Sequence, residues 1–455
     1  MSEPMQAAPR PMLLNAFDMA CVGHIQQGMW RHPRDRSAQY TRLSHWTELA
    51  RLLERGLFDG LFLADVLGVY DVYGGTPDAA LRGAAQVPLL DPTLLIPAMA
   101  AATSHLGFGV TCNLAYEPPY LFARRMSTLD HLTGGRIGWN IVTGYLDSAA
   151  RALGYTAQMA HDDRYDLADE YMAAVYALWE GSWAEDAVRR DKAGGVYTDP
   201  TRVRRIHHHG AQYRLDAMHL CEPSPQRSPV LYQAGASERG RRFAALHAEC
   251  VFVNGSTPEI VAALVADLRA RAGARPIRAL VGATVVVGRT AAEAQSMLAD
   301  YAASADAEAT LAHASASLGI DLARFDMDQP IEAAPGNAIQ SNVTAMARIA
   351  GPAWTKRKLL EQSVLGSRQP PIVGDPAQVA DALMQWMALA DIDGFNLSRT
   401  VMPECLEAFI DLVVPILQER GAYKTAYASG TYREKLFGAG RLLDAPHPAA
   451  GYRMV

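Results

Sequence analysis

The sequence predicts an α/β protein folded as a closed (β/α)8 barrel of the TIM type, and two observations carry this prediction. Eight short apolar runs rich in β-branched residues recur along the chain, and segments with helical periodicity separate most of them. This alternation is typical of parallel strands joined by helices, and eight repeats fit a closed barrel better than an open doubly wound sheet. The expected strands span residues 13–19, 58–66, 106–114, 136–144, 229–235, 248–255, 277–288 and 391–399.

Helical patterns occupy the connections between these strands. After the third strand, apolar residues are spaced to share one helix face, namely Phe122, Met126, Leu129 and Leu132. After the sixth strand, a helix is expected from a Thr-Pro start at Thr257 to a glycine stop at Gly273.

The repeat predicts a single barrel domain over residues 1–455, interrupted by three insertions. These are Leu67–Leu90, Glu185–Ser228 and Ala305–Pro371, which do not follow the strand–helix pattern. Insertions of this length usually form lids or oligomer contacts.

The composition narrows the classes of partner and compartment. Hydrophobic residues make up 49% of the 455 residues and the formal net charge is −6, so we expect a large core and neither nucleic acid nor an anionic membrane as partner. The five cysteines are scattered without CxxC spacing, as in reduced thiols. The N-terminal residues lack the basic start and apolar stretch of a signal peptide, so we expect a cytoplasmic protein.

Active sites of such barrels lie at the carboxyl ends of the strands. The residues at these ends are Cys21, His24, Asp65, Tyr70, Thr111, Asn113, Asn140, Thr143, Gly144 and Tyr145. After the fifth strand, the turn at residues 234–237 precedes a helix whose N–H groups suit a phosphate, although serine is also a common helix cap. The rim is rich in hydrogen-bonding groups and poor in titratable ones.

Several of these residues allow a second interpretation. Asp65 can cap a turn, and Asn140 can satisfy a neighbouring strand. Cys21 near His24 lacks a third group that would orient a nucleophile. The adjacent histidines 207–209 alternate in direction along a strand, and no acidic or cysteine residue is spaced to complete a ligand set, so we expect an exposed face and no metal site. No GxGxxG follows a strand, so a bound nicotinamide cofactor is not indicated.

The segment from Phe122 to Gly154 closely resembles the signature of bacterial-luciferase-like flavin monooxygenases, in particular the nitrilotriacetate and dibenzothiophene-sulfone monooxygenase group. Further segments that fit are residues 15–33, 58–73, 161–183, 221–252, 393–397 and 430–438. The motifs VYDVY and CEPSPQR lean toward the branch of long-chain alkane and dimethylsulfide monooxygenases. The resemblance covers most of the chain and is weakest over Ala305–Pro371.

This resemblance implies a two-component enzyme. It would take reduced FMN from a separate NAD(P)H:flavin reductase and transfer one oxygen atom of O2 to a small apolar or sulfur-containing substrate, such as a sulfide, a sulfone or an alkane-like chain. The protein would orient the flavin and exclude water, with the long insertion as a lid. Relatives are commonly dimers or tetramers, so we expect a homo-oligomer.

The resemblance also assigns residues by position. The flavin ring and ribityl chain would contact Asp65, Thr111, Asn140, Gly144 and Tyr145, and the phosphate would contact Tyr165, Ala234, Gly235, Ala236 and Ser237. Candidates for the substrate pocket are Cys21, His24, Tyr70, Gln86 and His313, and no catalytic residue is assigned. The chain departs from the family at Gly144, where many relatives have serine, and Tyr145 stands at a variable position.

Two alternatives stay open. One is a deazaflavin-dependent oxidoreductase of the same superfamily that transfers hydride and ignores O2. The other is a barrel that binds flavin without catalysis. A metal-dependent hydrolase is disfavoured, because no convincing His/Asp ligand set lies at the strand ends.

Overall fold

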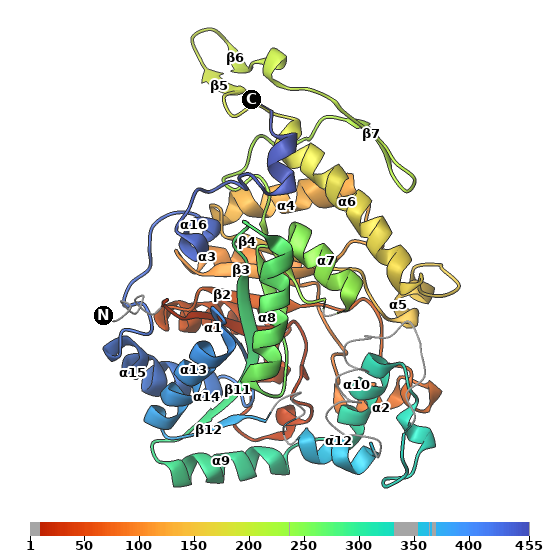
Figure 1. Cartoon of the computed structure of the whole chain (residues 1–455), viewed down its shortest axis with the longest axis vertical. Coiled ribbons are helices and arrows are strands. Elements are labelled where there is room, and N and C mark those ends of the chain that lie inside the picture. Colours follow the sequence, from red (N-terminus) through yellow and green to blue (C-terminus); the bar gives the residue numbers. More distant parts are fainter. Residues whose placement is uncertain (1–9, 236, 332–353, 364, 366–369, 455) are drawn as a thin grey trace, which may run out of the picture.

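Eight parallel strands close into a barrel, as the sequence predicts (Figure 1). The computed structural model describes residues 10–235, 237–331, 354–363, 365 and 370–454. The barrel strands are β1 (Leu13–Met19), β2 (Gly60–Ala64), β3 (Gly107–Asn113), β4 (Ile137–Val142), β9 (Val230–Gln233), β10 (Cys250–Val253), β11 (Arg278–Val287) and β13 (Gly394–Ser398). Each pairs in parallel with the next in this order, and β13 pairs with β1 to close the ring.

Aromatic side chains fill the middle of the barrel. The rings of Phe62, Tyr232 and Phe252 meet at centroid distances of 4.3 to 5.7 Å. Below them, Tyr432 of helix α16 (Tyr432–Phe437) enters at the amino ends of the strands, where a Cβ on Gly107 would lie 2.3 Å from its ring. The C-terminal helix therefore closes the amino end, and the opposite end carries the candidate site.

Helices cover the outer surface of the barrel. They include α1 (Leu43–Arg55), α3 (Ile96–Ala101), α4 (Pro119–Thr133), α6 (His161–Gly181), α7 (Glu238–His247), α8 (Pro258–Ala272), α9 (Ala291–Ala303), α13 (Pro376–Ala390), α14 (Glu404–Ala408) and α15 (Val414–Glu419). Helix α5 (Asp147–Ala152) packs instead against the first insertion, where a Cβ on Gly68 would lie 2.7 Å from the Ala149 nitrogen. The start signal of α8 is confirmed, because the Thr257 side chain accepts a hydrogen bond from the Ile260 N–H. Part of the prediction for α4 is wrong: Leu132 is 63% exposed, since it lies about 80° around the helix from Phe122.

The three segments expected as insertions hold short elements of their own. The first contains α2 (Asp78–Gly83) and a 3-10 turn at Tyr73–Gly75; the second contains the hairpins β5 (Val188–Asp191) with β6 (Val196–Thr198) and β7 (Ile206–His209) with β8 (Arg214–Ala217). The described part of the third contains α10 (Ala307–Leu318), a 3-10 turn at Leu322–Arg324 and α12 (Lys356–Gln362). The short strand β12 (Ile372–Gly374), which the sequence did not predict, extends β11 outside the barrel.

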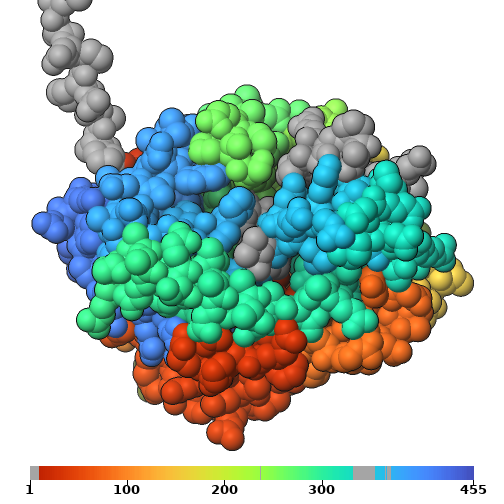
Figure 2. All heavy atoms as spheres, turned by 90° about the horizontal axis from the view of Figure 1, so that it is seen from below, coloured from red at the N-terminus to blue at the C-terminus, as the bar shows by residue number. Residues whose placement is uncertain are grey.

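Helix α10 packs on α2 across more than 200 residues of sequence. A Cβ on Gly83 of α2 would lie 2.5 Å from the Cβ of Ala309, so the two helices are in close contact. In Figures 1 and 2 the teal segment that contains α10 lies beside the orange segment that contains α2. The first and third insertions thus pack against each other.

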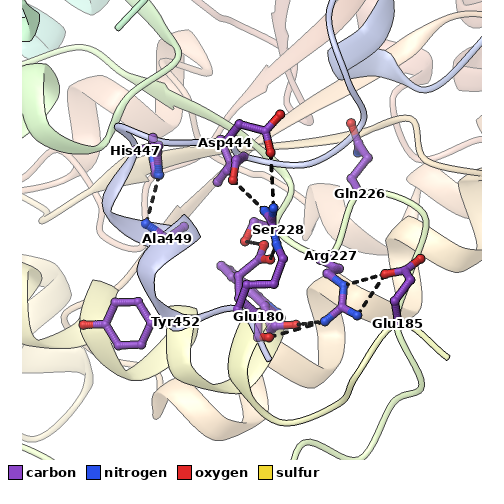
Figure 3. Close-up of polar contacts among 12 residues, drawn as sticks. Glu180, Glu185, Gln226, Arg227, Ser228, Asp444, His447, Ala449 and Tyr452 are labelled. Carbon is purple, nitrogen blue, oxygen red and sulfur yellow. Dashed lines mark hydrogen bonds and ion pairs between the residues drawn. The ribbon is translucent and has the colours of Figure 1, made fainter. Parts of the chain in front are cut away.

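The C-terminal segment is tied to the end of α6 by buried polar contacts (Figure 3). Glu180 is fully buried and accepts hydrogen bonds from the Ser228 hydroxyl at 2.8 Å and the Arg453 guanidinium at 3.1 Å. Arg204 of the second insertion donates to the carbonyl of Tyr452 at 3.3 Å. Among the described residues, no helix is long and apolar enough to cross a bilayer.

Candidate active site

A polar layer lies above the aromatic layer of the barrel, at the ends of β3 and β4. The register pairs Thr111 with Asn140, and the Asn140 amide donates to the Thr111 hydroxyl at 2.9 Å. The other amide atom, Asn140 Oδ1, is buried and accepts no hydrogen bond from any described residue. A buried carbonyl without a donor lowers stability, so this position suits an N–H group of a ligand.

Asp65 follows β2 directly and lies largely buried. Burial raises the pKa of its carboxyl to about 7 from an ordinary value of 3.8, and the neighbouring Asp91 carboxylate acts in the same direction. The carboxyl is therefore partly protonated near neutral pH and can donate a hydrogen bond in that form.

Tyr165 of α6 meets the turn that follows β9. A Cβ on Gly235 or on Gly240 would lie 2.7 Å from its hydroxyl, so both glycines are needed for this approach. Ser237 caps α7, because its hydroxyl accepts a hydrogen bond from the Gly240 N–H at 3.0 Å. The structure thus brings Tyr165 to Gly235 and Ser237, next to Ala234, while Ala236 lies outside the described residues.

Four expected site residues from three distant segments form one hydrogen-bonded chain. The Tyr70 hydroxyl donates to Gln86 Oε1, so it accepts from the Tyr145 hydroxyl, which lies 3.2 Å away. Gln86 Nε2 lies 3.5 Å from His313 Nε2, and the Tyr70 ring stacks on the His313 ring at 5.3 Å. Apolar residues, most of them alanines, pack around Tyr70, namely Ala80, Ala85, Leu146, Ala309 and Ala312.

Cys21 and His24 lie in the loop after β1, next to this chain. The Cys21 thiol donates to the Gly23 carbonyl, and burial raises its pKa to about 12, so the thiol is neutral and a poor nucleophile. The His24 ring meets Phe17 edge-on at 4.5 Å. The Gln86 N–H donates to the Gly23 carbonyl at 2.8 Å, which joins this loop to the first insertion.

The fold and this geometry agree with the comparisons to known proteins. A family model described as luciferase-like monooxygenase matches residues 26–391. The chain belongs to the luciferase-like monooxygenase family. It is therefore an oxidoreductase enzyme, and the predicted family and fold are confirmed.

Individual relatives align with nearly the whole length of this monooxygenase. The dimethyl-sulfide monooxygenase of Hyphomicrobium sulfonivorans is 46% identical over 97% of this chain and 94% of its own, and the crystal structure of DmoA from that organism superposes with a TM-score of 0.91. The long-chain alkane monooxygenase of Geobacillus thermodenitrificans is 48% identical over 97% of this chain and 98% of its own. A riboflavin lyase solved with modified FMN and riboflavin is 38% identical, with a TM-score of 0.92 over 98% of this chain and 100% of its own.

Two buried arginines lie beside the site of this monooxygenase, and the sequence alone did not indicate them. Arg399, after β13, pairs with Asp18 and donates to the carbonyls of Cys21 and Val22 at 3.0 and 2.8 Å, which fixes the loop that carries His24. Arg164 precedes Tyr165 and is 2% exposed; burial lowers the pKa of its guanidinium. Arg164 could have been selected from the sequence because it precedes Tyr165, whereas Arg399 lies in no recognisable motif.

The histidine run lies away from the barrel mouth. His207 is exposed on β7, and His208 contacts Glu170 of α6 at 3.2 Å. Across the described ranges, no group of three or more His, Cys, Asp or Glu residues is arranged to hold a metal ion.

Proposed function

We propose that this monooxygenase is the oxygenating component of a two-component system. It takes reduced FMN from a separate NAD(P)H:flavin reductase and transfers one oxygen atom of O2 to a small apolar or sulfur-containing substrate, such as a sulfide, a sulfone or an alkane-like chain. The names of the dimethyl-sulfide and long-chain alkane relatives, at 46% and 48% identity, support this substrate range. The sequence lacks a dinucleotide fingerprint, so the electrons of NAD(P)H are best supplied through another protein.

The observation that carries the proposal is the unpartnered acceptor at the polar rim. Asn140 Oδ1, buried above the aromatic layer, fits a ring N–H of reduced flavin. The Tyr165 hydroxyl lies close to Gly235 and Gly240 at the start of α7, and the N–H groups of a first helical turn fit a phosphate. We assign the flavin ring and ribityl chain to Asp65, Thr111, Asn140, Gly144 and Tyr145, and the phosphate to Tyr165 and residues 234–237.

The protein's own part in the reaction is to bind, orient and exclude water. When bound, reduced FMN supplies the electrons that activate O2. We assign the substrate to the pocket walled by Cys21, His24, Tyr70, Gln86 and His313. The neutral thiol and the hydrogen-bonded phenol there offer no charge, and alanine side chains surround Tyr70, which suits an apolar substrate.

The proposal extends to the organisation of the chain. We infer one barrel domain over residues 1–455 with insertions near residues 67–90, 185–228 and 305–371. A cytoplasmic location is supported by the five cysteines, all of which are free. A homo-oligomer, either a dimer or a tetramer, is supported by the exposed leucines Leu94, Leu121 and Leu132, which line one groove.

The test is an anaerobic titration of the protein with reduced FMN beside one with oxidised FMN and one with a deazaflavin. We expect reduced FMN to bind at least about tenfold more tightly than oxidised FMN, a difference of about 1.4 kcal/mol. Mixing the reduced complex with O2 and dimethyl sulfide or an alkane should then give oxygenated product. Binding of the deazaflavin alone, or of no cofactor, would reject the proposal.

A further inference from the structure

We infer that Asn113 and Gln158 form a two-donor subsite beside Gly144 that hydrogen-bonds an oxygen atom of the FMN side chain, a ribityl hydroxyl. This inference rests on the proposed function, because it names residues that hold the same cofactor. Neither residue is among those that the resemblance assigns to FMN.

The first observation is the space at Gly144, just after β4. Its φ is +75°, in the left-handed region that favours glycine. A Cβ there would lie 2.5 Å from Asn113 Nδ2 and 3.1 Å from Gln158 Nε2. Two side-chain amide nitrogens, one from the end of β3 and one from the loop before α6, therefore converge on this glycine.

The orientation of both amides follows from their oxygen atoms. Asn113 Oδ1 accepts a hydrogen bond from the Ala115 N–H at 2.9 Å. Gln158 Oε1 accepts from the Tyr116 hydroxyl at 2.9 Å and from the Met159 N–H at 3.0 Å. Flipping either amide would break these bonds, so the NH2 groups are the ones that face Gly144.

The second observation is a buried donor without a partner. Gln158 is only 6% exposed, and its Nε2 makes no hydrogen bond to any described residue. A buried N–H2 group that lacks an acceptor destabilises the protein, and such groups in native proteins usually have a ligand or water to bond. Because both groups at Gly144 donate, the partner they fit is an oxygen atom with lone pairs.

The position of the subsite favours the ribityl chain over the ring or the substrate. Gly144 lies four residues after Asn140, which we assign to the ring. On the other side, the Met159 carbonyl accepts a hydrogen bond from Arg164 at 2.7 Å, next to Tyr165 at the phosphate turn. We therefore place the two donors between the groups assigned to the ring and those assigned to the phosphate, the interval in which FMN has its ribityl hydroxyls.

The test uses two variants that act on the subsite in different ways, with a matched control. Gln158→Glu replaces the donor with an oxygen while it keeps the side-chain length. Gly144→Ala pushes Asn113 Nδ2 aside. Gly154→Ala is the control, because Gly154 also has a left-handed φ, +89°, but has no atom within 4 Å of its Cβ position.

The readout is the dissociation constant for reduced FMN and for reduced riboflavin in anaerobic titrations, which needs no turnover. We expect Gln158→Glu and Gly144→Ala each to weaken binding of both flavins about tenfold, and Gly154→Ala to leave both unchanged. If Gln158→Glu does not fold, Gln158→Leu, which removes the same donor, is titrated in its place.

Three outcomes would overturn the inference, and they can be told apart. Unchanged affinities in the folded subsite variants would reject the subsite while the wild type still binds reduced FMN, so the proposed function would stand. A loss of affinity for FMN alone, with riboflavin unaffected, would indicate that the two donors bind the phosphate and not the ribityl chain. Failure of the wild type to bind any reduced flavin would reject the proposed function itself.

Discussion

At the level of single residues, burial determines the protonation state of polar groups at the barrel mouth. The Cys21 thiol, which follows β1 and lies near a histidine, resembles a nucleophile in the sequence. In the structure it is neutral because burial raises its pKa to about 12. The carboxyl of Asp65, whose pKa is raised to about 7 by burial, changes its charge near neutral pH.

Asp65 gives the first prediction, on the pH dependence of stability. Its folded pKa, about 7, lies above the ordinary value of 3.8, so between these pH values the folded state holds a proton that the unfolded state has released. The free energy of unfolding should therefore fall as pH rises through this window. Asp65→Asn removes the titration, so urea unfolding should show a smaller fall for this variant than for the wild type.

The control for this measurement is Asp78→Asn, which changes an exposed carboxylate of the first insertion. It should keep the wild-type slope between about pH 4 and pH 7. Parallel pH profiles for the wild type and Asp65→Asn would show that Asp65 titrates with its ordinary pKa.

How far the sequence predicts the site is clearest from these residues. The rule that sites lie at strand ends selects Asp65, Thr111 and Asn140 as candidates, because strand positions depend on local apolar patterns. It could not find the pairing of Arg399 with Asp18, since the two residues are 381 positions apart and neither lies in a motif. The same holds for the contact of Gln86 with His313, which depends on how two insertions pack.

At the level of elements, all eight strands of the barrel were predicted, whereas outside it only the histidine run of β7 was expected to lie in a strand. A barrel strand such as β4 is buried and apolar, so its run of residues is distinctive. The strands β5 (VRRD) and β7 (IHHH) are short and mostly polar, and their pairing satisfies backbone groups without an apolar pattern. Strand β12 has only three residues, which are too few to show an alternating or continuous apolar pattern in the sequence.

The second prediction concerns the chain that joins α10 to the barrel. Tyr70→Phe removes the hydroxyl between Gln86 and Tyr145 and leaves the buried Gln86 Oε1 without its Tyr70 donor. We expect a loss of about 1–2 kcal/mol in the free energy of unfolding. We also expect more H2O2 per turnover, because a looser insertion admits water to the mouth.

Stopped-flow oxidation of reduced FMN, with H2O2 and product counted together, measures this coupling. Tyr73→Phe is the control, since Tyr73 is a phenol of the same insertion outside the hydrogen-bonded chain. An equal increase of H2O2 in both variants would assign the effect to general loosening of the insertion and not to the chain.

At the level of the whole molecule, the two ends of the barrel are closed differently, and one side carries a groove with exposed leucines. Helix α16 blocks the amino end with Tyr432, while α10 packs over the carboxyl end through His313. On the side of α4, a surface groove of about 510 Å³ runs beside two exposed leucines, Leu121 and Leu132. Apolar patches of this kind usually mark interaction sites.

The last prediction is that this groove is where two copies of the chain meet. Leu94 is 76% exposed and Leu121 is 51% exposed, and the groove also holds Asp91 and Arg124. In a two-fold dimer the same patch meets itself, so leucines bury leucines while the carboxylate can face the guanidinium of the partner. Leu121→Glu should therefore shift the assembly to smaller species in sedimentation velocity, whereas Leu389→Glu on α13, also 51% exposed, should not. If both variants sediment as the wild type does, the chain assembles through another face, and if the wild type is a monomer, the proposed homo-oligomer is wrong.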